Sequence, residues 1–110
     1  MDRGLERADW QVAAPQLLQV EVLQVLRRRV GAGYTSLDDA EQARLLMRDL
    51  NIRYFDHPML EERTWELRDN LTACEAGYVA LAEILGVPLL TSDARIAGAP
   101  GLVAVCIVVD

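Results

Sequence analysis

Short apolar segments alternate with longer helical patterns along this chain, and this alternation constrains the fold most. Apolar segments span residues 10–14, 87–91 and 102–109, and residues 52–56 add a run with β-branched and aromatic side chains. Because apolar and polar residues do not alternate in these segments, they predict strands covered on both faces, as in a parallel sheet. The helical patterns between them predict an α/β fold with helices flanking that sheet.

Capping signals set the expected helix boundaries. Pro15 suits the first turn of a helix. Ser36 and Thr72 each precede an acid by three residues, as N-cap residues do, and Gly86 suits a helix end. The first helix is apolar on most of its circumference, so we expect it to be buried on more than one side. The expected helices span residues 16–30, 37–50, 58–68 and 73–85, with a single turn at 94–97.

The chain length predicts one domain, residues 1–110, because 110 residues enclose one core and leave no room for a second module. No segment reaches the roughly 18 consecutive apolar residues that a membrane span needs. The start, residues 1–7, lacks the apolar stretch of a secretory signal. We therefore expect a protein of the cytoplasm with no membrane partner.

The net charge of −6 at pH 7 argues against a general nucleic-acid-binding surface, which depends on Lys and Arg. Clustered carboxylates would also give an acidic total, and bound divalent cations would reverse the local sign, so RNA binding is not excluded. Cys74 and Cys106 lie far apart without a Cys-x-x-Cys pattern, which indicates reduced thiols rather than a zinc site.

Glu21 lies at an unfavourable position for a carboxylate. At 100° per residue it falls between Leu17 and Val25, inside the apolar arc of its helix. An ionised carboxylate buried there needs a cation, a hydrogen-bond network or access to water. A bound metal would meet this need, and so would a salt bridge to Arg28 or another arginine; the sequence alone leaves both open.

Glu75 and Asp93 each have a structural and a functional interpretation. Glu75 is the third residue of a capping box, which by itself favours a structural role. Asp93 follows the strand at 87–91, at the strand end where α/β sheets place ligands, but it also suits an N-cap of the turn at 94–97. Taken together, the three acids would form an oxygen cluster suited to Mg²⁺ or Mn²⁺.

Three segments resemble the VapC-type toxins of the PIN-domain family. Residues 65–83, WELRDNLTACEAGYVALAE, resemble that family's W-x-L-R-x-N-L-T-A-Y-D-A-x-Y-V-A-L-A-E. Residues 87–95 include its L-L-T-x-D-x-R, and residues 14–22 resemble its A-P-x-L-L-x-x-E-V. The likeness covers most of the chain.

The resemblance implies a PIN-like three-layer fold and a Mg²⁺- or Mn²⁺-dependent endoribonuclease. Such an enzyme is the toxin of a type II toxin–antitoxin system, a homodimer that cleaves structured transfer or ribosomal RNA and is neutralised by a cognate antitoxin. It also overturns the local interpretation of Glu75. The implied metal ligands and catalytic acids are Glu21, Glu75 and Asp93, with Asn70, Thr72 and Thr91 as polar support and Arg95 as an RNA contact.

The chain departs from the family pattern in two places. Glu75 stands where the family has Asp, with Cys74 in place of its tyrosine. The family's opening strand and its first catalytic Asp are missing ahead of residue 10, so we expect an N-terminally truncated PIN domain. An upstream start, a decayed relative or a replacement strand would each explain this. The tail at 106–110 resembles the missing strand, although an ordinary last strand is the preferred interpretation.

Two functions therefore remain: a metal-dependent ribonuclease, or a catalytically impaired remnant that acts in dimerisation or antitoxin binding. A nucleotide-binding domain is a weaker third interpretation, because the glycines at 31–33 follow a helix and do not connect a strand to one.

Overall fold

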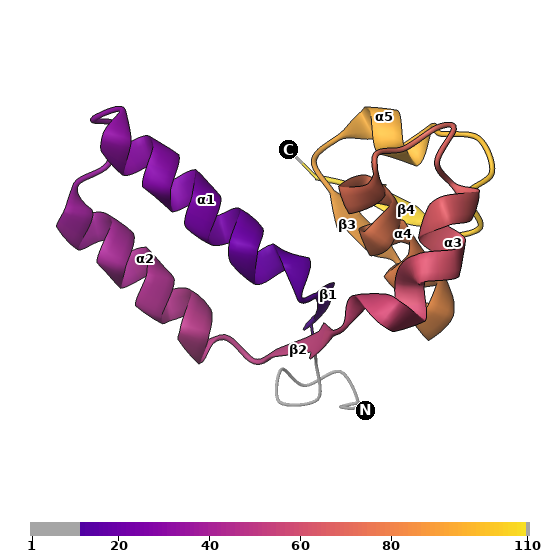
Figure 1. Ribbon diagram of the computed structural model, residues 1–110, viewed down its shortest axis with the longest axis horizontal. Helices are drawn as coiled ribbons and strands as arrows, with labels where there is room; N and C mark the ends of the chain where they lie inside the picture. Colours follow the sequence, from indigo (N-terminus) through magenta and orange to yellow (C-terminus); the bar gives the residue numbers. More distant parts are fainter. Residues whose placement is uncertain (1–11, 110) are drawn as a thin grey trace, which may run out of the picture. The chain divides into compact units, whose positions relative to one another are not determined.

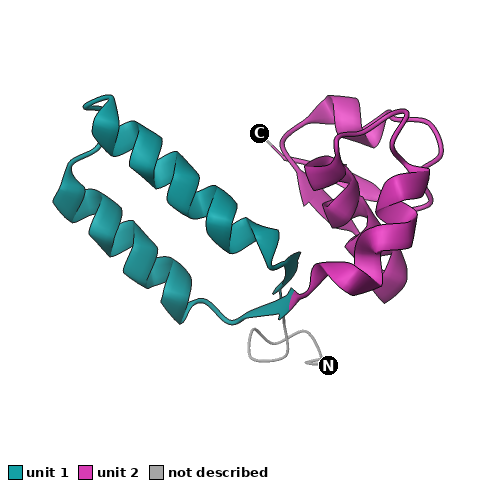
Figure 2. Cartoon of the chain, in the orientation of Figure 1, with its two compact units in different colours: residues 1–54 teal, residues 55–110 magenta. Residues whose placement is uncertain are grey.

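The computed structural model describes residues 12–109, so Trp10, Gln11 and Asp110 of the predicted strands lie outside the described residues. The chain divides into two compact units, and the boundary falls between Tyr54 and Phe55 (Figure 2).

The first unit holds two helices and a two-stranded sheet (Figure 1). The helices form an antiparallel hairpin, and Ser36 caps the second of them by accepting a hydrogen bond from the Asp39 amide at 3.1 Å, as predicted. Pro15 ends the first strand and does not open the helix, which begins two residues later. The elements are β1 (Val12–Pro15), α1 (Leu17–Gly31), α2 (Leu37–Asp49) and β2 (Ile52–Phe55), whose last residue already belongs to the second unit.

The predicted burial of α1 on more than one side is wrong for this structure. No residue of α1 is buried, and Val20 and Val25 are 63% and 53% exposed. In α2, only Ala40 is buried among the helix residues. A two-helix hairpin covers one side of each helix, which leaves apolar side chains on the other sides in solvent.

The second unit contains most of the buried core. The helix predicted at 58–68 is shorter and is divided into a 3₁₀ turn and a six-residue α-helix. The helix predicted from the second capping box is confirmed, and Gly86 ends it in the left-handed conformation with φ +66°. The elements are η2 (His57–Leu60), α3 (Glu61–Glu66), α4 (Ala73–Leu85), β3 (Leu89–Thr91), α5 (Ala94–Ala97) and β4 (Cys106–Val108).

Strands β3 and β4 run parallel, with Leu89 opposite Cys106 and Thr91 opposite Val108. This pairing and the flanking helices confirm the α/β class. The described strands form two sheets of two strands each in place of the single sheet that was expected.

The last strand is shorter than the predicted segment 102–109. Its preceding residues bond elsewhere: the Val103 and Ala104 amides both donate to Glu83 Oε2. Backbone groups committed to a side chain are not available to a strand ladder.

The core of the second unit forms along α4. Val79 and Ala76 are fully buried, and Leu67 and Leu71 complete the cluster from the segment before the helix. Half-buried side chains of β3, α5 and the loop after α5 pack against them: Leu89, Ile96, Ala99, Leu102 and Ala104. This packing holds the start of α4 close to the end of β3.

Candidate active site

Glu75 lies in the first turn of α4, where a complete capping box fixes it. The Thr72 hydroxyl accepts from the Glu75 amide at 3.1 Å, and the Thr72 amide donates to Glu75 Oε1 at 2.9 Å. One carboxylate oxygen is thus held by the backbone, which leaves Oε2 to bond elsewhere. The capping box expected from the sequence at Thr72 and Glu75 is confirmed.

Asp93 follows β3 and is held in a comparable way. Its Oδ1 accepts from the Arg95 amide at 2.9 Å, which caps α5, and its own amide donates to the Thr91 hydroxyl at 3.0 Å. Again one oxygen is bound to the backbone and the other, Oδ2, is directed elsewhere. Thr72 and Thr91, both predicted as polar support, therefore bond the backbone amides of the two acids.

Arg95 joins the two acids. Its Nη2 donates to Glu75 Oε2 and, at 3.1 Å, to Asp93 Oδ2. Two oxygens from separate elements, the start of α4 and the end of β3, thus converge on one nitrogen. The Arg95 side chain is 60% exposed, while Glu75 is 20% and Asp93 42% exposed, so the cluster lies at the surface.

Hydrogen bonds within the cluster shift the pKa values of Glu75 and Arg95. The pKa of Glu75 lies below its usual value, first because its carboxylate accepts the Thr72 backbone bond and then because Arg95 donates to it. The pKa of Arg95 is raised by its bond to Glu75 and by the charges of both acids. Glu75 therefore remains an anion, the form that binds a cation.

The other predicted site residues are placed differently. Glu21 lies on α1 in the first unit, half-buried, whereas Glu75 and Asp93 belong to the second. The Asn70 side chain donates to the Pro100 carbonyl at 3.3 Å and so connects the loop after α5 to the segment before α4. Within residues 12–109, no three His, Cys, Asp or Glu side chains are grouped so that they would hold a metal ion.

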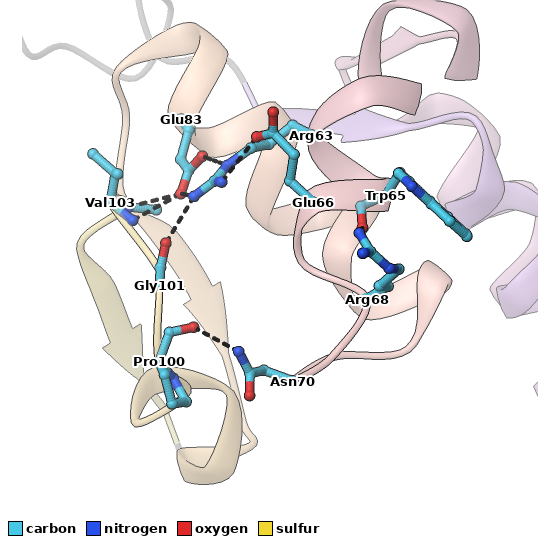
Figure 3. A network of polar contacts seen from close by, with 10 residues as sticks. Arg63, Trp65, Glu66, Arg68, Asn70, Glu83, Pro100, Gly101 and Val103 are labelled. Carbon is cyan, nitrogen blue, oxygen red and sulfur yellow. Dashed lines mark hydrogen bonds and ion pairs between the residues drawn. The ribbon is translucent and has the colours of Figure 1, made fainter.

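One charged cluster was not predicted from sequence. Arg63 on α3 pairs with Glu83 on α4, and both bond the loop at 101–104 (Figure 3). The available signal was the position of Glu83, which directly follows the apolar run 79–82 of α4. A carboxylate at the end of so buried a helix face needs a partner.

Comparison of the whole sequence with known proteins identifies the family of the chain. No family model matches the chain. Ribonuclease VapC1 of Mycobacterium tuberculosis is 50% identical over 93 residues, which are 81% of this chain and 68% of that protein. The chain belongs to the VapC ribonuclease family.

Two further members of the VapC family from the same organism are similar. Ribonuclease VapC9 is 38% identical over 82 residues, 74% of this chain and 65% of the relative. Ribonuclease VapC12 is 34% identical over 90 residues, 82% of this chain and 70% of the relative. The parallel strands and flanking helices agree with the PIN-like α/β fold that this family implies. None of the described helices is long and apolar enough to span a membrane.

Proposed function

We propose that this protein is a metal-dependent endoribonuclease and the toxin of a toxin–antitoxin pair. Glu75 and Asp93, with Glu21, are the proposed catalytic acids and the ligands of Mg²⁺ or Mn²⁺. The observation that carries the proposal is the convergence of Glu75 Oε2 and Asp93 Oδ2 on one cationic nitrogen, Nη2 of Arg95. Two carboxylate oxygens that bind the same positive group are also suited to bind a metal cation.

The chemistry of the two carboxylates fits a magnesium-like ion. Each carboxylate has one oxygen fixed by a backbone amide and the second directed to the shared point. Mg²⁺ is commonly bound by one or two carboxylates and retains several waters, so two acids within one unit suffice to hold it. Glu21 as the third ligand rests on the family resemblance.

In this proposal, different residues bind the metal, position its ligands and contact the RNA. Glu75 and Asp93 hold the ion, the Thr72 and Thr91 hydroxyls keep both acids in place, and Arg95 contacts an RNA phosphate. When bound, such an ion supplies a water of lowered pKa for attack on phosphorus. The relatives are named ribonucleases, which supports RNA as the substrate.

The proposed cellular context follows the family. The substrate is structured RNA, transfer or ribosomal, the protein acts as a homodimer in the cytoplasm, and a cognate antitoxin protein holds it inactive.

Cleavage of a structured RNA tests the proposal. We expect cleavage with Mg²⁺ or Mn²⁺, none with EDTA, and a loss of at least about 100-fold in Glu75→Gln and in Asp93→Asn, as for other groups that bind the reacting centre. Glu21→Gln tests the third ligand in the same assay. Glu66→Gln is the control, because this exposed carboxylate pairs with Arg63 and contacts neither acid.

The second candidate function is a catalytically impaired PIN-like remnant that acts in dimerisation or antitoxin binding. The favouring observation is that both carboxylate oxygens of Glu75 have partners within the chain, the Thr72 amide and the Arg95 guanidinium. If the folded protein cleaves no RNA at high concentration with either metal, the enzymatic function is wrong for this chain and the remnant remains.

A further inference from the structure

Arg95 is bound in the place where the proposed site requires a cation. Its Nη2 touches the one oxygen of Glu75 and the one oxygen of Asp93 that the backbone leaves free. Two carboxylates that share one partner nitrogen would repel each other without a positive group between them. The guanidinium of Arg95 supplies that positive group.

The same oxygens cannot serve Arg95 and a metal together. Mg²⁺ binds carboxylate oxygen at about 2.0–2.1 Å, much closer than the nitrogen of a hydrogen bond. An ion held by Glu75 Oε2 and Asp93 Oδ2 would compete with the guanidinium for the same two oxygens, and the two positive charges would repel each other. The two cations therefore exclude each other.

The Arg95 side chain is also able to move away from Glu75 and Asp93. Its side chain is 60% exposed, and within residues 12–109 its guanidinium donates to these two carboxylates. Its backbone stays anchored, because the Arg95 amide donates to Asp93 Oδ1, the oxygen that faces away from the shared point. The side chain can thus rotate into solvent while α5 and Asp93 keep their places.

We infer that Arg95 is an internal counter-ion that competes with the metal for Glu75 and Asp93 and is released when the metal binds. This inference rests on the proposed metal site and adds that Arg95 is released from the two acids when the metal binds, before it contacts RNA. A metal held by the two acids would free the guanidinium to contact an RNA phosphate, so Arg95 would couple RNA contact to metal binding.

Binding of Mn²⁺ to the whole protein, measured by titration calorimetry without RNA, tests the competition. We expect Arg95→Gln, which keeps the length and removes the charge, to bind Mn²⁺ about three- to tenfold more tightly than the unchanged protein. Arg95→Lys keeps the charge and should stay within about twofold. Arg68→Gln is the matched control, since that guanidinium lies over the Trp65 ring, 4.6 Å from its centroid, and does not contact the acids.

A second measurement separates direct contact from a general effect of charge. At about 0.5 M salt, long-range attraction is largely screened, so the gain in Arg95→Gln should persist. In EDTA, Arg95→Gln should also melt at a lower temperature than the unchanged protein, and Mn²⁺ should raise its melting temperature by the larger amount.

The outcomes distinguish the two proposals. If the unchanged protein binds Mn²⁺ but Arg95→Gln binds no tighter, or gains only at low salt, the counter-ion role is wrong and the metal site stands. If neither protein binds Mn²⁺, the proposed metal site fails and the competition fails with it.

Discussion

Arg63 on α3 and Glu83 on α4 form an ion pair of 2.7 Å between Nε and Oε1, with the carboxylate only 11% exposed (Figure 3). The pair does more than join two helices. Arg63 Nη2 donates to the Gly101 carbonyl at 2.7 Å, and Glu83 Oε2 accepts from the Val103 amide at 2.8 Å. The segment that leads into β4 is therefore held by this pair.

Glu83→Gln should lower the free energy of unfolding by about 2–3 kcal/mol, because it removes the charge of the more buried of the two carboxylates that pair with the half-buried Arg63. Urea unfolding followed by circular dichroism measures this loss. Glu66→Gln is the control: this second partner of Arg63 is 52% exposed, and its loss should cost within about 0.5 kcal/mol. Equal losses in the two variants would contradict a central role for Glu83.

The same pair predicts a dependence of stability on pH. Burial raises the pKa of Glu83, but the bond from Arg63 and the Val103 amide outweigh it, so the pKa lies below its usual value. A carboxylate with a lowered folded pKa stabilises the fold at neutral pH, and this contribution is lost as pH falls through the folded value. Arg63 faces Glu83, and its bond to that carboxylate raises the pKa of Arg63, so the guanidinium stays charged while Glu83 is protonated.

Unfolding free energy should therefore decline from about pH 5 downward. The decline should be shallower in Glu83→Gln, which has no carboxylate to protonate at this position. Urea titrations at several pH values measure both slopes. Parallel slopes for the two proteins would show that other groups cause the acid sensitivity.

Substitution by alanine should change stability in opposite directions at Gly77, inside α4, and at Gly86, the residue that ends this helix. Gly86 ends the helix at φ +66°, where a Cβ is strained, so Gly86→Ala should cost about 1 kcal/mol. Gly77 lies inside the helix, and a Cβ added there meets nothing within 4 Å, so Gly77→Ala should gain about 0.5–1 kcal/mol. Thermal unfolding of both variants measures the two stability changes. If Gly86→Ala stabilised the protein as Gly77→Ala is expected to do, Gly86 would not be the strained residue that ends the helix.

Features set by neighbouring residues were predicted well from sequence. The caps formed by Ser36 and Thr72 and the helix end at Gly86 depend on side chains within three or four positions along the chain. The bonds that orient Glu75 and Asp93 are local for the same reason. Local chemistry therefore predicted both the helix starts and the anchoring of two site acids.

Features that depend on distant partners were not predicted. The burial of α1 and the length of β4 depend on what packs against them, and hydrophobic pattern alone does not specify this. Arg63 with Glu83, and Glu75 with Arg95, are pairs separated by twenty residues along the chain. The family resemblance predicted separate roles for Glu75, as a metal ligand, and Arg95, as an RNA contact, and only the fold brings the two side chains into one cluster.

Glu75→Asp tests the smaller of the two departures of this chain from its family pattern. The shorter side chain reaches the Thr72 amide less well, so we expect a stability loss of about 0.5 kcal/mol from the weakened capping box. It also draws the second oxygen back toward α4 and restores the family's residue at this position. Because Mg²⁺ requires strict geometry, we expect metal-dependent RNA cleavage to rise several-fold.

Single-turnover cleavage and thermal unfolding of the same preparation measure these two opposed effects. Glu66→Asp is the control, since it shortens an exposed carboxylate that lies away from Arg95 and should change neither quantity. A loss of stability together with a rise in cleavage would show that Glu75 favours the helix cap at the expense of the metal site. Unchanged or lower cleavage would mean that the longer acid already suits this site and that the departure does not limit activity.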